Sequence, residues 1–152
     1  MSTAVFPGSF DPVTTGHVDL IRRASRMFDR LVVGVLVNSA KQPLFSKEER
    51  VAMLREITAD QDNIEVSSFE GLLVDFVKEQ HADAIVRGLR TPGDFEYELP
   101  LAQANHKLSV QADTIFLASA PEYSYISSSA VRELLRYQAD ISGYVPETVL
   151  RY

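Results

Sequence analysis

Residues suited to holding a phosphate group gather in one segment near the N-terminus. The segment from Phe6 to His17 reads FPGSFDPVTTGH and links a short β-branched run to an amphipathic helix. Gly8 and Gly16 let the backbone approach a ligand closely, because they lack a Cβ. Thr14 or Thr15 can cap the helix, whose free N–H groups and positive dipole end favour an anion. The pattern therefore predicts a phosphate site.

His17 falls in the first turn of that predicted helix, directly after a glycine. An imidazole there can donate to a phosphate oxygen, and a nearby phosphate favours its protonated form. A capping or core role is the alternative for a histidine, but this setting favours a phosphate ligand. His81 and His106 lack such a setting and are interpreted as ordinary surface or packing residues.

Three cations follow predicted strands. Lys41 lies in a loop, where a flexible ammonium can follow a phosphate as its charge redistributes. Arg87 and Arg90 flank Gly88-Leu89, and their guanidinium forks suit bidentate recognition of phosphate oxygens. Solvated side chains with weak salt bridges are the alternative for all three. Their places at the ends of strands favour the phosphate role.

A run of serines precedes another amphipathic helix, in the segment Ile126-Ser127-Ser128-Ser129. One hydroxyl can cap that helix, and the others can join the exposed N–H groups in holding the terminal phosphates of a nucleotide. The two roles are compatible, so the segment predicts a second phosphate contact.

Short apolar runs alternate with helical patterns and predict the elements that position these residues. We expect buried parallel strands at 3–6, 31–37, 63–69, 84–87 and 113–118. Residues 1–152 then form a single-domain α/β fold, a Rossmann-like doubly wound parallel sheet of about five strands. Ligands bind beyond the carboxyl ends of such strands, which is where the candidate residues fall.

Two of these motifs resemble the signatures of the nucleotidylyltransferase superfamily. Residues 14–17 match (T/H)xGH, and residues 126–129 resemble its second signature, ISSS. Within the superfamily the chain resembles the bacterial phosphopantetheine adenylyltransferases, because PGSFDPxTxGH, a lysine at 41, RGLR and DFEYE are also in register. The resemblance covers nearly the whole chain.

The resemblance implies an activity in coenzyme A synthesis. The phosphate of 4′-phosphopantetheine would attack the α-phosphorus of ATP in line, giving dephospho-CoA and pyrophosphate without a covalent intermediate. His17, Lys41 and Arg90 would be catalytic and would stabilise the transition state. The family also implies Mg²⁺ held through phosphates and water, a homohexamer, and CoA as an inhibitor.

Binding residues are implied position by position. The ATP site would comprise Ser9, Phe10, His17, Gly88, Leu89, Arg90, Glu98, Tyr123, Ser124, Tyr125, Ile126, Ser127, Ser128 and Ser129. The 4′-phosphopantetheine site would comprise Ser9, Lys41, Leu73, Arg87 and Asn105. No protein metal ligand is expected, and Asp11 is interpreted as a structural residue that bridges loop backbone groups.

The helix expected over 94–108 has two unusual features. Pro100 lies two residues after Glu98, and proline inside a helix removes a donor and tends to kink the chain, so the orientation of Glu98 is open. Apolar or aromatic residues fall on two faces of this helix. One face can cover the sheet, and the second predicts a subunit contact.

Composition excludes several classes of protein. The chain has no cysteine, which excludes disulfides and thiolate chemistry, and its formal charge of −6 argues against long nucleic acid as a partner. No apolar stretch approaches the ~20 residues of a membrane span, and no signal-peptide pattern begins the sequence, so we expect a cytoplasmic protein.

Two alternatives to the implied activity stay open. The same signatures serve enzymes whose acceptor is nicotinamide mononucleotide or glycerol 3-phosphate. A nucleotide-binding sensor without turnover is the other, because a fold alone does not establish activity. A dehydrogenase is disfavoured, since no G-x-G-x-x-G follows the first predicted strand.

Overall fold

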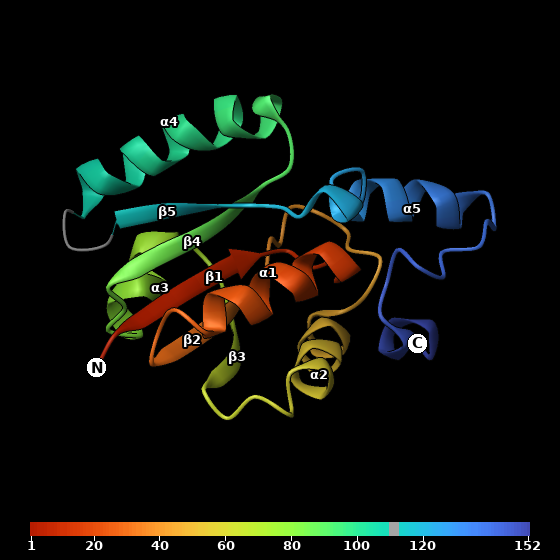
Figure 1. The fold of residues 1–152 in the computed structure, drawn as a ribbon, viewed down its shortest axis with the longest axis horizontal. Coiled ribbons are helices and arrows are strands. Elements are labelled where there is room, and N and C mark those ends of the chain that lie inside the picture. Colours follow the sequence, from red (N-terminus) through yellow and green to blue (C-terminus); the bar gives the residue numbers. More distant parts are fainter. Residues whose placement is uncertain (110–112) are drawn as a thin grey trace.

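Five parallel strands form one sheet in the order β3-β2-β1-β4-β5 (Figure 1). The computed structural model describes residues 1–109 and 113–152. The order reverses direction at β1, which confirms the predicted doubly wound sheet. The strands are β1 (Thr3–Gly8), β2 (Arg30–Leu36), β3 (Ile64–Phe69), β4 (Ala84–Leu89) and β5 (Asp113–Ala118).

Helices connect the strands and cover both faces of the sheet. They are α1 (Thr15–Ser25), α2 (Lys47–Ile57), α3 (Leu73–Glu79), α4 (Pro92–Leu108), α5 (Ser128–Arg136) and α6 (Glu147–Leu150), with a 3-10 turn at Pro121–Tyr123. In Figure 1, α5 lies just beyond the end of β5, at the edge where the parallel strands finish. The connections therefore bring the loops after the strands to one edge.

Two hydrophobic clusters lie on opposite faces of the sheet, because side chains alternate along each strand. Ala4 and Phe6 belong to the larger cluster, which includes buried residues of α1, α2, α5 and α6. Val5 belongs to the smaller cluster, with Phe76 and Val77 of α3. Central strands buried on both faces explain the continuous apolar runs in the sequence.

Strand β4 is longer than the sequence pattern predicted. The structure extends this strand beyond its expected end at Arg87, through Gly88 to Leu89, so the loop begins only after Leu89. Arg87 and Gly88 pair in register with Phe116 and Leu117 of β5, which keeps the backbone extended beyond the apolar run. Arg87 ends the apolar run, so the sequence pattern did not indicate that the strand continues.

Helix α4 runs through Pro100 without interruption. Thr91 caps it by accepting from the Asp94 N–H, and Pro92 occupies its first turn. Glu98 is the buried residue of α4, only 8% exposed. Proline two residues later therefore leaves this carboxylate turned inward.

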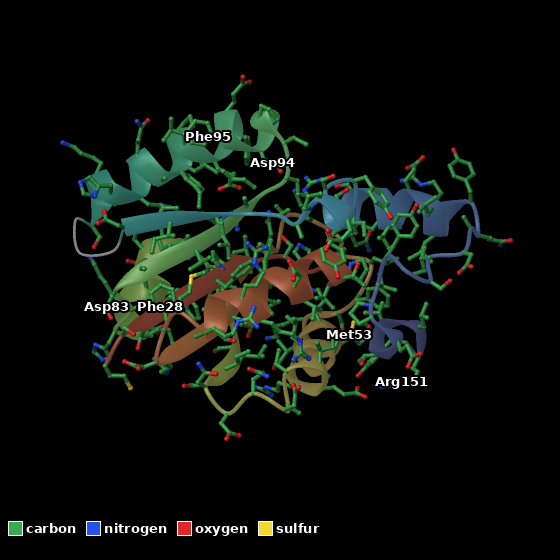
Figure 2. The ribbon with its side chains drawn as sticks, viewed as in Figure 1. Phe28, Met53, Asp83, Asp94, Phe95 and Arg151 are labelled. Carbon is green, nitrogen blue, oxygen red and sulfur yellow. The ribbon has the colours of Figure 1, made fainter. Side chains whose placement is uncertain are left out.

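The C-terminal segment packs beside α2. Figure 2 shows Arg151 on the same side of the molecule as Met53 of α2, and the Arg151 guanidinium pairs with Glu56 of that helix. Pro146 is the N-cap of α6. Over the described residues, no helix is long and apolar enough to cross a membrane.

Candidate active site

A cavity of about 460 Å³ opens at the carboxyl edge of the sheet, within the size range of small-molecule sites. Segments after β1, β2, β4 and β5 contribute to it. Twelve residues predicted for the site line it: Ser9, Phe10, His17, Lys41, Arg87, Gly88, Arg90, Glu98, Ile126, Ser127, Ser128 and Ser129.

Six other candidate residues lie outside this lining. They are Leu73, Leu89, Asn105, Tyr123, Ser124 and Tyr125. Tyr123 nevertheless packs near the phosphate segment, since a Cβ added to Gly16 would meet its Cβ at 3.4 Å. Leu73 begins α3 and Asn105 lies in the last turns of α4, so their proposed contacts with the acceptor stay predictions.

The start of α1 fixes the tautomer of His17. Thr14 is the N-cap, and its Oγ1 accepts from the His17 N–H at 3.2 Å. The Thr14 N–H in turn donates to His17 Nδ1 at 3.0 Å. Because Nδ1 is the acceptor in this capping box, the ring proton resides on Nε2. His17 therefore offers an N–H donor from a ring that lines the cavity.

His17 is neutral in the free protein. Burial lowers its pKa from 6.5 to about 4, and the charges of Arg87 and Arg90 act in the same direction. The sequence predicts a protonated ring beside a bound phosphate. In the unliganded protein the charges of Arg87 and Arg90 favour the neutral ring instead. Phe10 packs edge-on against the ring, with the centroids 5.0 Å apart. Protonation beside a bound phosphate stays a prediction.

Arg87 is held by three oxygen atoms. Its Nε and Nη2 donate to the two carboxylate oxygens of Glu98 at 3.0 and 2.6 Å. Its Nη1 donates to the Pro7 carbonyl at 2.7 Å. The bidentate pair fixes the guanidinium plane at the cavity wall. Glu98 thus orients Arg87, and its contact with a ribose stays a prediction.

Arg90 lies beside the N-terminus of α4. The Asp94 carboxylate accepts from the Arg90 backbone N–H at 2.9 Å and from its Nη2 at 3.4 Å. Figure 2 shows Asp94 in the first turn of α4, next to the loop that leaves β4. The long side-chain contact holds Arg90 loosely, which leaves its fork available to an anionic ligand in the cavity.

The three serines take three different roles. Ser127 is the N-cap of α5 and accepts from the Ala130 N–H at 3.0 Å, as the sequence predicted for one of them. Ser128 Oγ donates to the Pro12 carbonyl at 2.8 Å. Ser129 Oγ accepts from Arg132 at 3.1 Å. The first amides of α5 have no partner within the helix and can bind phosphate oxygens.

Gly88 serves packing as well as ligand access. A Cβ at this position would meet Leu20 Cδ1 of α1 at 2.3 Å. The helix that carries His17 therefore packs directly on the β4 backbone. A larger residue at 88 would force the Leu20 side chain to move.

Sequence reasoning missed two cavity-lining arginines. Arg132 donates to the Asp11 carbonyl at 2.8 Å and lies four residues after Ser128, so helical spacing could have placed it on the same face. Arg50 lies in α2 among charged residues, a pattern typical of a solvated face. No local signal distinguishes it, because its partners come from distant segments.

The carboxylates of the cavity are already engaged. Asp11 accepts from two backbone amides, Asp94 from Arg90, and Glu98 from Arg87. No group of three or more His, Cys, Asp or Glu side chains suited to a metal ion occurs in the described part of the chain. This donor set fits a cation carried by phosphate oxygens and water.

The fold and the site define the class. Two helix N-termini and a set of cations surround one cavity at the strand-order reversal, as a nucleotide phosphate site requires. The cytidylyltransferase-like family model matches residues 5–134. The protein is therefore a nucleotidyltransferase of the cytidylyltransferase-like class.

Curated relatives narrow this class. Proteins named phosphopantetheine adenylyltransferase from Lachnoclostridium phytofermentans and Caldanaerobacter subterraneus subsp. tengcongensis are 51% and 50% identical to it. These matches span 99% and 98% of this chain and 93% of each relative. A third, from Clostridium novyi, is 48% identical over 99% of this chain and 94% of its own length. The chain belongs to the phosphopantetheine adenylyltransferase family.

A solved structure supports the fold independently. The lipopolysaccharide core biosynthesis protein from Thermoplasma volcanium GSS1 superposes with a TM-score of 0.59 at 23% identity. The match covers 79% of this chain and 98% of that one. At this identity the likeness concerns the fold alone.

Proposed function

We propose that the protein transfers the adenylyl group of ATP to 4′-phosphopantetheine, which releases pyrophosphate and forms dephospho-CoA. The observation that carries this proposal is the meeting of His17, Lys41 and Arg90 around one cavity, in a chain about half identical to proteins named for this activity. The N-termini of α1 and α5 add anion-binding amides at the same place.

The reaction needs positioning and charge stabilisation more than covalent chemistry. A phosphate oxygen of the acceptor attacks the α-phosphorus of ATP, and the bond from that phosphorus to the pyrophosphate oxygen breaks. His17 donates from Nε2 to an α-phosphate oxygen. Lys41 and Arg90 stabilise the negative charge on the transferring group and on pyrophosphate.

ATP and the acceptor approach from different walls. The serine segment at 126–129, with Phe10 and Gly88, contacts the nucleotide, and the α5 amides hold its terminal phosphates. Ser9 and Arg87 hold the acceptor's phosphate, with Arg87 oriented by Glu98. We expect Leu73 and Asn105 to contact other parts of the acceptor.

We expect Mg²⁺ to be held by the phosphates of ATP and by water. The engaged carboxylates and the absence of a three-ligand cluster among the described residues support a cation bound by phosphates and water. When bound, it neutralises phosphate charge during transfer.

We expect a homohexamer in the cytoplasm, with CoA as an inhibitor that shares the pantetheine arm of the product. The exposed apolar side chains of α4 support a subunit contact: Phe95, Tyr97, Leu101 and Leu108.

Magnesium-dependent pyrophosphate release from ATP tests the function. We expect release with 4′-phosphopantetheine and none with nicotinamide mononucleotide or glycerol 3-phosphate. His17→Ala serves as the comparison, since removing one transition-state donor costs roughly 10²–10³ in kcat. Pyrophosphate release with another acceptor would show that 4′-phosphopantetheine is not the substrate. ATP binding without pyrophosphate release would support the alternative of a nucleotide-binding sensor. Near-normal turnover of His17→Ala would contradict a role for His17 in stabilising the transition state.

A further inference from the structure

The loop that carries Lys41 joins β2 to α2, and Lys41 lies at its exposed tip. The Lys41 N–H donates to the Asn38 carbonyl at 3.1 Å, and Asn38 Oδ1 accepts from the Ala40 N–H at 3.0 Å. These contacts shape the tip but do not join it to the rest of the site. A lysine ammonium on a long flexible stem acts as a point charge, so its placement depends on how the ends of the loop are fixed.

Arg50 fixes the start of this loop. It extends from the first turn of α2 and is only 4% exposed. Its Nη1 donates to the Leu36 carbonyl at 3.1 Å, where β2 ends, and to the Ser9 carbonyl at 2.9 Å in the β1–α1 segment. Its Nε donates to the Phe45 carbonyl at 3.2 Å. One cation therefore joins three chain segments.

Asp11 fixes the end of the same loop. Its side chain is 7% exposed, and its two carboxylate oxygens accept from the Leu44 and Phe45 N–H groups at 2.8 and 2.9 Å. Asp11 thus holds the N–H of Phe45, and Arg50 holds its carbonyl. Both ends of the Lys41 loop are tied to the segment that leads directly to His17.

Burying the charges of Arg50 and Asp11 costs free energy, which is a high cost if closing the loop is their only role. A buried charge loses hydration, and hydrogen bonds to neutral carbonyls replace it only in part. A planar fork that reaches three carbonyls at once fixes geometry in a way that an apolar contact does not. Arg50 also lines the cavity, beside the residues assigned to phosphate binding.

We propose that Arg50 and Asp11 are positioning residues of adenylyl transfer, acting through Lys41. They hold the Lys41 loop at a fixed distance from the His17 segment, so that the ammonium and the imidazole reach the same phosphate group. The proposal rests on the proposed function for its kinetic consequence, whereas its structural consequence is independent of any substrate.

A double-mutant cycle tests the kinetic consequence. A displacement of 1 Å can cost about 10²-fold, so we expect Arg50→Gln to lower kcat by about 10- to 100-fold with little change in KM for ATP. In a Lys41→Ala background the same substitution should lower kcat by less than about threefold, because residues that act through one another are not additive. Equal losses in both backgrounds would overturn the proposal.

Matched variants separate positioning from general destabilisation. Arg55 lies on the same helix and donates to the Val66 carbonyl at 3.2 Å, away from the Lys41 loop, so Arg55→Gln should keep full turnover. Arg50→Lys keeps the charge but not the fork and should recover only part of the loss. If Arg50→Gln does not fold, Asp11→Asn serves in the same cycle, since the side chain keeps its shape and loses one acceptor.

Hydrogen exchange provides a readout that needs no substrate. We expect the amides of 37–45 to exchange faster in Arg50→Gln and Asp11→Asn than in the unsubstituted protein, and at the unsubstituted rate in Arg55→Gln. Unchanged exchange in the loop would contradict the proposal even if the enzyme is active. If the loop exchanges faster in these variants but the unsubstituted protein turns over no acceptor, the positioning role would be supported and the proposed function would be wrong.

Discussion

His17 is a neutral hydrogen-bond donor in the unliganded protein, and its neighbours determine this state. Thr14 directs the proton to Nε2, while burial and the charges of Arg87 and Arg90 keep the ring uncharged. A neutral imidazole can donate to phosphate without first taking up a proton. We therefore expect the arginines to supply positive charge to a bound phosphate and the histidine to supply a directed hydrogen bond.

The protonation state of His17 should be visible in the unliganded protein. Because folding lowers its pKa from 6.5 to about 4, the ring should stay neutral at and above about pH 5. Between pH 4 and pH 6.5 the unfolded chain binds more protons at this residue than the folded chain does. The contribution of His17 to the free energy of unfolding therefore decreases as pH falls from 6.5 toward 4. NMR titration of the His17 ring measures this directly.

The controls for this titration come from the same site. His17→Ala identifies the resonance, and Arg90→Gln should raise the pKa of His17 by removing one nearby positive charge. A midpoint near 6.5 in the unsubstituted protein would contradict the neutral-donor assignment. A bound phosphate should move the midpoint upward, because a negative charge favours the imidazolium.

Elements determined by local pattern were predictable from the sequence, and contacts between distant segments were not. The strand at 113–118 agrees with the structure, because a short apolar run acts within a few positions. The cap expected at Thr14 or Thr15 is Thr14, and the cap expected among the three serines is Ser127. Arg50 depends on carbonyls at the ends of other elements. Its role becomes visible only once the sheet has brought those elements together.

Strand β2 carries a glycine whose role is also set by distant residues. A Cβ on Gly34 would lie 2.8 Å from a ring carbon of Phe76 and 3.2 Å from one of Phe69. The two rings stack with centroids 4.5 Å apart and planes 15° apart. Helix α3 can therefore pack closely on this face only if position 34 lacks a side chain.

Gly34→Ala should lower the free energy of unfolding by about 1–3 kcal/mol, the usual cost of overpacking a core. Gly93→Ala is the matched control, since its nearest atom would be Thr91 Oγ1 at 3.7 Å and alanine favours a helix. Urea unfolding measures both variants. Equal stability of Gly34→Ala and the unsubstituted protein would show that the aromatic pair can move aside without cost.

On the scale of the whole molecule, one helix is poorly covered by its own chain. Helix α4 exposes Tyr97 at 70%, Leu101 at 44% and Leu108 at 56%, and Ile115 of the neighbouring strand β5 is 42% exposed. In Figure 1, α4 lies along the outer side of β4 and β5, with its other side open. The predicted second apolar face is therefore present, and an apolar surface of this kind is typical of a subunit interface.

The hexamer proposal predicts that charge on this surface weakens assembly. We expect light scattering to give six chain masses for the unsubstituted protein and a smaller, concentration-dependent mass for Tyr97→Asp/Leu101→Asp. A buried carboxylate without a partner is costly in an interface, whereas most exposed substitutions change the stability of one chain by about 0.5 kcal/mol or less. Tyr137→Asp is the control, because Tyr137 is 73% exposed at the end of α5. A single chain mass for the unsubstituted protein would contradict the hexamer, and full assembly of the double variant would place the interface elsewhere.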